Sequence, residues 1–207
     1  MAGIPIGVTN FYYGLVKADD KDTWTVEDVK RIKFLNEITV EAEQDVAKAF
    51  GDNQTAAKAT FNGDITVSTT FVNIPVEDKA ILSGAKYEDG IVRFNKDDIP
   101  PDVAVVFERT LHDGSSEWLG LYKGTFTRPS ENGKTKEEGI EFQNAEVEGT
   151  FIPRDKDGNT HIMVTDDKGV TANRDTLFTE MFGKTYEEIV NPENVNPENV
   201  NPEDVSA

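Results

Sequence analysis

The chain has 207 residues, of which 37% are hydrophobic, and it carries a formal net charge of −18. This length is typical of one domain with an appendage, because domains usually span about 100 to 200 residues. The excess of 39 acidic over 21 basic residues repels nucleic acid phosphates, so the composition argues against a DNA- or RNA-binding module.

The chain contains no cysteine, which excludes a disulfide framework, a thiolate nucleophile and cysteine-based metal sites. Its first residues, MAGIPIGVTNFYYGLV, have neither the basic segment nor the unbroken apolar stretch of a signal peptide. The longest apolar runs elsewhere are far shorter than the roughly 20 residues of a membrane-spanning helix. The sequence therefore predicts a soluble, non-secreted protein without a membrane partner.

Alternation of apolar and polar residues is the dominant period, and it predicts strands with one packed and one solvated face. It is clearest at residues 38–43 and 64–71. Further strands are expected at residues 10–16, 57–61, 91–94, 103–110, 117–127, 140–151 and 160–165. Tight turns are expected at three Gly-containing dipeptides, residues 62–63, 132–133 and 157–158, and a bulge near Gln143. This pattern predicts a mainly β fold, an antiparallel sandwich or barrel-like structure.

One flanking helix is predicted at about residues 75–83. Pro75 suits the first helical position, the acidic residues after it favour the first turn, and Gly84 can end the helix. A weaker helical pattern covers residues 174–182.

The C-terminal residues differ in kind from the rest of the chain. From residue 191 they read NPENV, NPENV and NPEDV, and a proline in each repeat excludes both a continuous helix and a central strand. We therefore expect three parts: an N-terminal arm at residues 1–9, a β-sandwich domain at 10–186 and an acidic repeat tail at 187–207.

No catalytic, cofactor-binding or metal-binding residue is predicted. His112 and His161 have no second ligand at metal spacing, and the calcium-like string DKDGNTHIMVTD has its glycine at the wrong position. With 39 acids, the sequence cannot select the pair of carboxylates that an acidic hydrolase would need. An acidic hydrolase therefore remains the least favoured hypothesis.

A carbohydrate-binding or adhesion module is the alternative function. Trp118, Tyr122 and Phe126 occupy alternating positions of one predicted strand, and such a row could stack sugar rings. Core packing is the commoner reason for an aromatic row of this kind.

The order of several segments resembles the major tail protein, the tail tube subunit, of long-tailed, non-contractile siphophages. The similar segments are GVTNFYYGLV, KRIKFLNEITVEAE, GDITVSTTFVNIP with the helix VEDKAILSG, and LYKGTF followed by a Lys-rich loop, IEFQ and EGTF. The resemblance implies a β-sandwich with one flanking helix, assembled as hexameric rings that stack into a tube and conduct DNA during ejection.

The resemblance also implies a structural virion protein, made in the host bacterial cytoplasm, that has neither catalytic residues nor a cofactor. Its partners would be further copies of itself and other tail proteins, such as the tape measure, tail terminator and distal tail proteins. DNA would pass through the tube without specific binding.

Two sets of residues are candidates for these roles. Polar positions on two predicted strands are expected to face the lumen: Thr39, Glu41, Glu43, Thr66, Ser68 and Thr70. Val46 and Phe50, in the segment 43–57 between those strands, have no apolar partner nearby in the sequence, so they are expected to contact another subunit. The segment 43–57 and the N-terminal arm are the candidate ring-to-ring elements.

Overall fold

The computed structural model describes residues 3–51, 54–130 and 144–192. The strands are β1 (Pro5–Asp19), β2 (Trp24–Ile32), β3 (Leu35–Gly51), β4 (Gln54–Phe71), β5 (Lys86–Glu88), β6 (Ile91–Arg93), β7 (Val103–Leu111), β8 (Ser116–Phe126), β9 (Ala145–Ile152) and β10 (His161–Asp166). The helices are α1 (Val76–Leu82), α2 (Ala172–Phe182) and α3 (Tyr186–Val190). Of the helices in these ranges, none is both long and apolar enough to cross a membrane.

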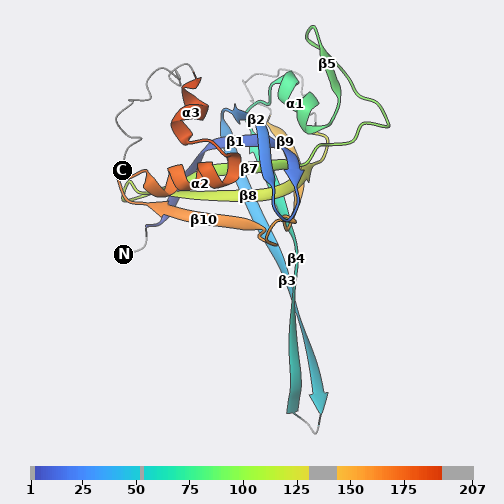
Figure 1. The fold of residues 1–207 in the computed structure, drawn as a ribbon, viewed down its shortest axis with the longest axis vertical. Helices are drawn as coiled ribbons and strands as arrows, with labels where there is room; N and C mark the ends of the chain where they lie inside the picture. The colour runs from blue at the N-terminus through green and yellow to red at the C-terminus, as the bar shows by residue number, and fades with distance from the viewer. Residues whose placement is uncertain (1–2, 52–53, 131–143, 193–207) are drawn as a thin grey trace, which may run out of the picture.

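The strands form one antiparallel 8-stranded sheet in the order β2-β1-β7-β8-β9-β4-β3, with β10 added on β8, and a separate hairpin of β5 and β6. Strand β8 is where the sheet divides, because its first half pairs with β10 and its last four residues pair with β9. This arrangement confirms the predicted antiparallel, sandwich-like fold with a flanking helix, α1, beside which lie α2 and α3 (Figure 1).

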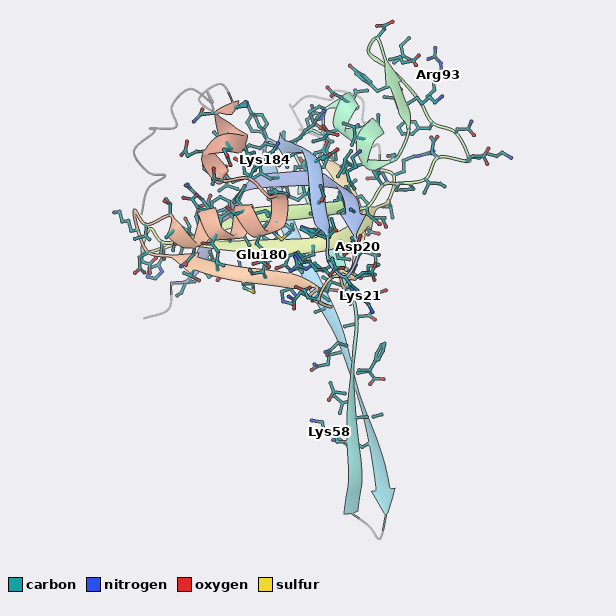
Figure 2. The ribbon with its side chains drawn as sticks, viewed as in Figure 1. Asp20, Lys21, Lys58, Arg93, Glu180 and Lys184 are labelled. Carbon is teal, nitrogen blue, oxygen red and sulfur yellow. The ribbon has the colours of Figure 1, made fainter. Side chains whose placement is uncertain are left out.

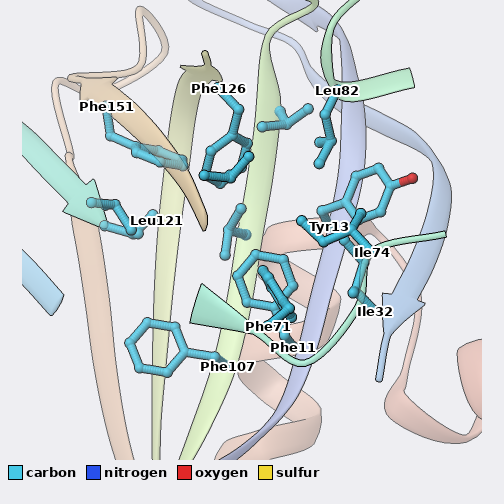
Figure 3. Close-up of a cluster of buried hydrophobic side chains, with 14 of the residues drawn as sticks. Phe11, Tyr13, Ile32, Phe71, Ile74, Leu82, Phe107, Leu121, Phe126 and Phe151 are labelled. Carbon is cyan, nitrogen blue, oxygen red and sulfur yellow. The ribbon is translucent and has the colours of Figure 1, made fainter. Parts of the chain in front are cut away.

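The larger core lies between the two halves of the folded sheet (Figure 3). Its aromatic rings meet edge to face, with Phe11 and Phe71 at 5.1 Å and Phe126 and Phe151 at 5.7 Å between centroids. Gly124 is required beside this contact, since a Cβ there would lie 2.4 Å from the Phe151 ring and 2.6 Å from a backbone oxygen. Close packing of the rings therefore depends on a glycine inside β8.

A second core lies on the opposite face of the same strands, under α2 and α3. Phe178 of α2 is fully buried and makes edge-to-face contacts with Tyr12, Trp118, Phe182 and Tyr186. Strand β7 is consequently buried on both faces, which explains why it reads as a continuous apolar run instead of an alternating one.

The end of the domain differs from the sequence-based expectation. The helical pattern at 174–182 is confirmed by α2, but the boundary expected after residue 186 falls inside α3. Two side chains of α3, Tyr186 and Ile189, pack against the second core. A capping box of Thr185 and Glu188 begins α3, and this pair of residues is a signal for a helix start at the sequence level.

The segment 43–57 was expected to connect two strands and instead continues both of them. Strand β3 runs to Gly51 and β4 begins at Gln54, so the two form a long hairpin that projects from the body (Figure 1). The turn expected at residues 62–63 is wrong, because these residues lie within β4 at a register shift opposite Glu43. The other Asn-Gly dipeptide, at 132–133, and the expected bulge near Gln143 lie outside the described residues.

The N-terminal arm also differs from expectation. From Pro5 onward it is the first part of β1 and pairs with β7, from Pro5 opposite Leu111 to Thr9 opposite Glu108. Strand β2 was not predicted at all, because positive φ at Asp28 and two register shifts against β1 break its alternation.

A buried carboxyl links α1 to the larger core. Tyr13 Oη donates a hydrogen bond of 2.6 Å to Asp78 Oδ1, and Asp78 is only 7% exposed. Burial raises the pKa of Asp78 above its ordinary value of 3.8, although the Tyr13 hydrogen bond and the Lys30 charge act in the lowering direction. The folded protein therefore binds this proton more tightly than the unfolded chain does.

This carboxyl predicts a pH-dependent effect of Asp78→Asn. A raised pKa contributes stability below the unfolded value of 3.8, and that contribution is lost as the pH rises through the folded value. Relative to wild type, Asp78→Asn should therefore gain free energy of unfolding at pH 7 compared with pH 4, as measured by urea titration at both pH values. Glu88→Gln, at an exposed position of β5, is the control. An identical wild-type-to-variant difference at both pH values would contradict the prediction.

Candidate assembly surfaces

One outward face of the sheet is polar across three neighbouring strands, β3, β4 and β9. Residues that stand directly opposite one another form three rows: Glu37–Thr70–Glu146, Thr39–Ser68–Glu148 and Glu41–Thr66–Thr150. Eight of these nine side chains are exposed, and Thr70 is half-buried. The opposite side of β4 and β9 carries Ile65, Val67, Val147 and Phe151, which are buried in the larger core. We name these nine residues the carboxylate face.

Four carboxylates and no lysine or arginine lie in these rows. Neighbouring strands lie about 4.7 to 4.9 Å apart, so the two carboxylates of β3 stand about 10 Å across β4 from the two carboxylates of β9. Threonine and serine hydroxyls fill the positions between them. The face consequently repels phosphate and offers it no cationic contact.

The structure brings five of the six predicted lumen residues onto the carboxylate face. The sixth, Glu43, is exposed but lies at the register shift where the hairpin leaves the body. Sequence reasoning missed Glu37, Glu146, Glu148 and Thr150. Alternation in β9 was visible in the sequence, but only the pairing of β9 with β4 places Glu146 and Glu148 beside the predicted residues.

Among the described residues, three strands of the main sheet pair with one neighbour only and therefore have a free edge, namely β2, β3 and β10. Beside β3 the sandwich is open, with a groove of about 700 Å³ between β3 and strands β1, β7, β8 and β10. Apolar side chains line most of it, among them Ile38, Val40, Phe107 and Met163. Unpaired edges of this kind are where sheets of different chains can join.

The projecting hairpin presents two exposed faces. One carries the opposite pairs Gln44 and Asn62, Val46 and Thr60, and Lys48 and Lys58. The other carries Asp45 opposite Phe61 and Ala47 opposite Ala59. The hairpin projects beyond the body (Figure 2).

Of the two predicted inter-subunit residues, Val46 is 36% exposed on the hairpin. Phe50 pairs through its backbone with Thr55, and its side chain lies outside the described part of the structure. Sequence reasoning missed Phe61, which is 72% exposed. A turn expected at residues 62–63 would have ended the strand at Phe61, whereas this residue belongs to the hairpin.

The proposed sugar-stacking row does not exist as a surface. Trp118, Tyr122 and Phe126 are 3%, 1% and 1% exposed. A register shift between β7 and β8 changes the phase of β8, so Phe126 packs in the larger core while Trp118 and Tyr122 pack in the second one. These rings stabilise the protein and cannot contact a glycan.

The loop after β9, which contains the calcium-like string, is held in place by Arg154. Arg154, 5% exposed, stacks over the Tyr122 ring at 3.8 Å and binds Asp157 and Glu180. Hydrogen bonds from Arg154 lower the pKa of Asp157 to about 2. The carboxylate of Asp157 thus has a guanidinium partner, and the Arg154 side chain connects the loop to α2.

The two histidines lie apart from each other at the surface. His112 accepts a hydrogen bond of 2.9 Å from the backbone of Ile4, and His161 contacts Thr160. Within the described ranges, no cluster of three or more His, Asp or Glu residues is arranged to hold a metal ion.

Comparison with known proteins identifies the family. A sequence profile described as phage tail tube protein matches residues 37–188, from β3 through most of α3. The chain belongs to the phage tail tube protein family. This confirms the resemblance drawn from the order of segments, and it makes the protein a structural component of phage tails.

A search of curated proteins found no match. Among solved structures, a chain of the "Cryo-EM structure of the anti-feeding prophage (AFP) baseplate, 6-fold symmetrised" is similar, with 9% sequence identity and a TM-score of 0.43. The match covers 79% of this chain and 97% of that chain.

Proposed function

We propose that this tail tube protein is a non-catalytic subunit that assembles into stacked, hexameric rings, and that the carboxylate face lines the lumen through which DNA passes during ejection. The observation that carries the proposal is the exposed carboxylate face beside a free sheet edge. A wall of like charge lets phosphate pass without binding it. The tube would belong to a non-contractile siphophage tail.

The free sheet edges also support the proposed ring formation. If β3 of one copy lies against the next copy, the β3–β4–β9 layer continues around a closed ring and keeps the carboxylate face on one side. The hairpin then projects beyond the ring and is available to the next one. Tape measure, tail terminator and distal tail proteins are the proposed partners inside and at the ends of this tube.

Electron microscopy of the purified protein at increasing concentration tests the proposal. We expect rings and tubes with a central channel, and averaged end views should have six subunits. A protein that stays monomeric at every concentration, and saturably binds a glycan, would support the adhesion-module alternative instead.

Charge reversal on the carboxylate face predicts a change in DNA passage. In the variant Glu41→Lys with Glu148→Lys, tubes should form normally, because both side chains are exposed on the carboxylate face. DNA ejection from phage with these tubes should become slower and more salt-dependent, because the lysines would transiently bind the phosphates of the moving DNA. Fluorescence of DNA released from single virions measures the rate.

The matched control is Glu88→Lys with Glu187→Lys, which adds the same charge at exposed positions of β5 and α3. The control should eject DNA at the wild-type rate. Equal ejection rates of the two double variants at every salt concentration would exclude the lumen assignment of the carboxylate face.

A further inference from the structure

Two lysines face each other on the projecting hairpin. Lys48 of β3 stands directly opposite Lys58 of β4, so both side chains leave the same face of the two-stranded ribbon. Both are exposed, and Figure 2 shows Lys58 well beyond the body. We name them the lysine pair.

No ion pair with a described residue of the same chain compensates the positive charge of the lysine pair. Like charges directly opposite on neighbouring strands are destabilising. Neither lysine is in an ion pair with a described residue, while other lysines, such as Lys30 and Lys123, pair with carboxylates. The described acid of the hairpin, Asp45, leaves the opposite face, and its Oδ1 accepts a hydrogen bond from the Val46 backbone.

The surroundings of the lysine pair suit contact with another surface. On the same face the next pairs toward the body are Val46 with Thr60 and Gln44 with Asn62, which carry no charge. The Gln44 amide donates a hydrogen bond of 2.8 Å to Asn62, which connects the strands at the base. Among the described residues of this ribbon face, the pair is therefore the one charged site, and it is positive on a strongly acidic protein.

We propose that the lysine pair docks on exposed carboxylates of a second copy of this chain in the adjacent ring, so that ring stacking is electrostatic. This inference rests on the proposed ring assembly. Charge complementarity favours a second copy, because a net charge of −18 presents carboxylates to an approaching hairpin. DNA is disfavoured as the partner, because a chain of this net charge repels phosphate. The two lysines would also neutralise at most about two phosphates.

Neutralising the lysine pair tests the proposal. The variant Lys48→Gln with Lys58→Gln is compared with wild type and with Lys21→Gln plus Lys184→Gln, which removes the same charge from the body (Figure 2). Sedimentation of tubes at increasing protein and NaCl concentration gives the concentration at which stacking begins. We expect this concentration to rise about tenfold for the lysine-pair variant at low salt, and to lose most of its salt dependence.

Thermal melting of dilute, unassembled protein separates docking from folding. The lysine-pair variant should melt at the wild-type temperature or above it, because a repulsion has been removed. Tubes that form at the wild-type concentration, with wild-type salt dependence, would overturn the proposal while leaving the tube function intact. Absence of tubes from wild type and control alike would overturn both.

A DNA-binding assay distinguishes the other possible partner. Fluorescence anisotropy of a short labelled duplex should show no binding to dilute wild-type protein. Duplex binding that disappears in the lysine-pair variant, with unchanged stacking, would assign the pair to DNA and overturn docking between copies.

Discussion

Deletion of residues 45–61, with Gln44 joined to Asn62 through an Asn-Gly turn, is expected to leave the subunit folded and to abolish ring stacking. None of the described residues of the deleted segment belongs to either core. Gln44 and Asn62 already stand opposite each other, and a two-residue Asn-Gly turn suits such a junction. The subunit would lose the part of the hairpin that extends about 25 Å beyond Gln44 and Asn62, which is the part proposed to reach the next ring.

Near-ultraviolet circular dichroism and thermal melting check the fold, and electron microscopy at high concentration checks assembly. We expect single rings without tubes. A shorter deletion of residues 49–57, closed by the same turn, keeps Lys48 opposite Lys58 and should stack at intermediate concentrations. Tubes of normal length and yield from the longer deletion would exclude the hairpin from ring contact.

Replacement of Phe178 by alanine is expected to have the largest effect on stability. Its ring is completely buried and has four aromatic neighbours contributed by β1, β8, α2 and α3. Truncating a buried phenylalanine costs about 3 to 5 kcal/mol, which lowers the melting temperature of a domain of this size by on the order of 10 °C. Urea titration measures the free energy of unfolding.

Phe34→Ala is the matched control, because the same atoms are removed from a side chain that is 71% exposed. The backbone hydrogen bond from Val72 to the Phe34 carbonyl does not depend on the side chain. The control should lie within about 0.5 kcal/mol of wild type. A loss for Phe178→Ala as small as that of the control would mean that α2 contributes little to holding the body together.

Local patterns predicted the β-rich class and both longer helices because those signals act over a few residues. Alternation at 64–71 identified the buried side of β4, and proline and acids at the start of α1 identified the helix. The order of segments was sufficient to identify the tail tube family. None of these inferences requires knowing which strands are neighbours.

Neighbour relations between strands were decided only in the folded chain. Pairing of β9 with β4 places Glu148 beside Ser68, and the register shift near Glu43 separates that residue from the carboxylate face. The same kind of shift moves Phe126 to the core opposite Trp118. Side chains alternate with a period of two, so a single extra residue transfers every later side chain to the other face.

The sequence by itself determined that this protein is acidic, cysteine-free and composed of half-buried strands, because composition and short-range periodicity carry that information. Tertiary structure decided that residues 43–57 continue two strands, that two lysines of this hairpin oppose each other, and that nine polar side chains share one face. Each of these facts depends on register between segments far apart in the chain. Register is set by the burial of whole apolar faces and by bulges, which no local pattern specifies.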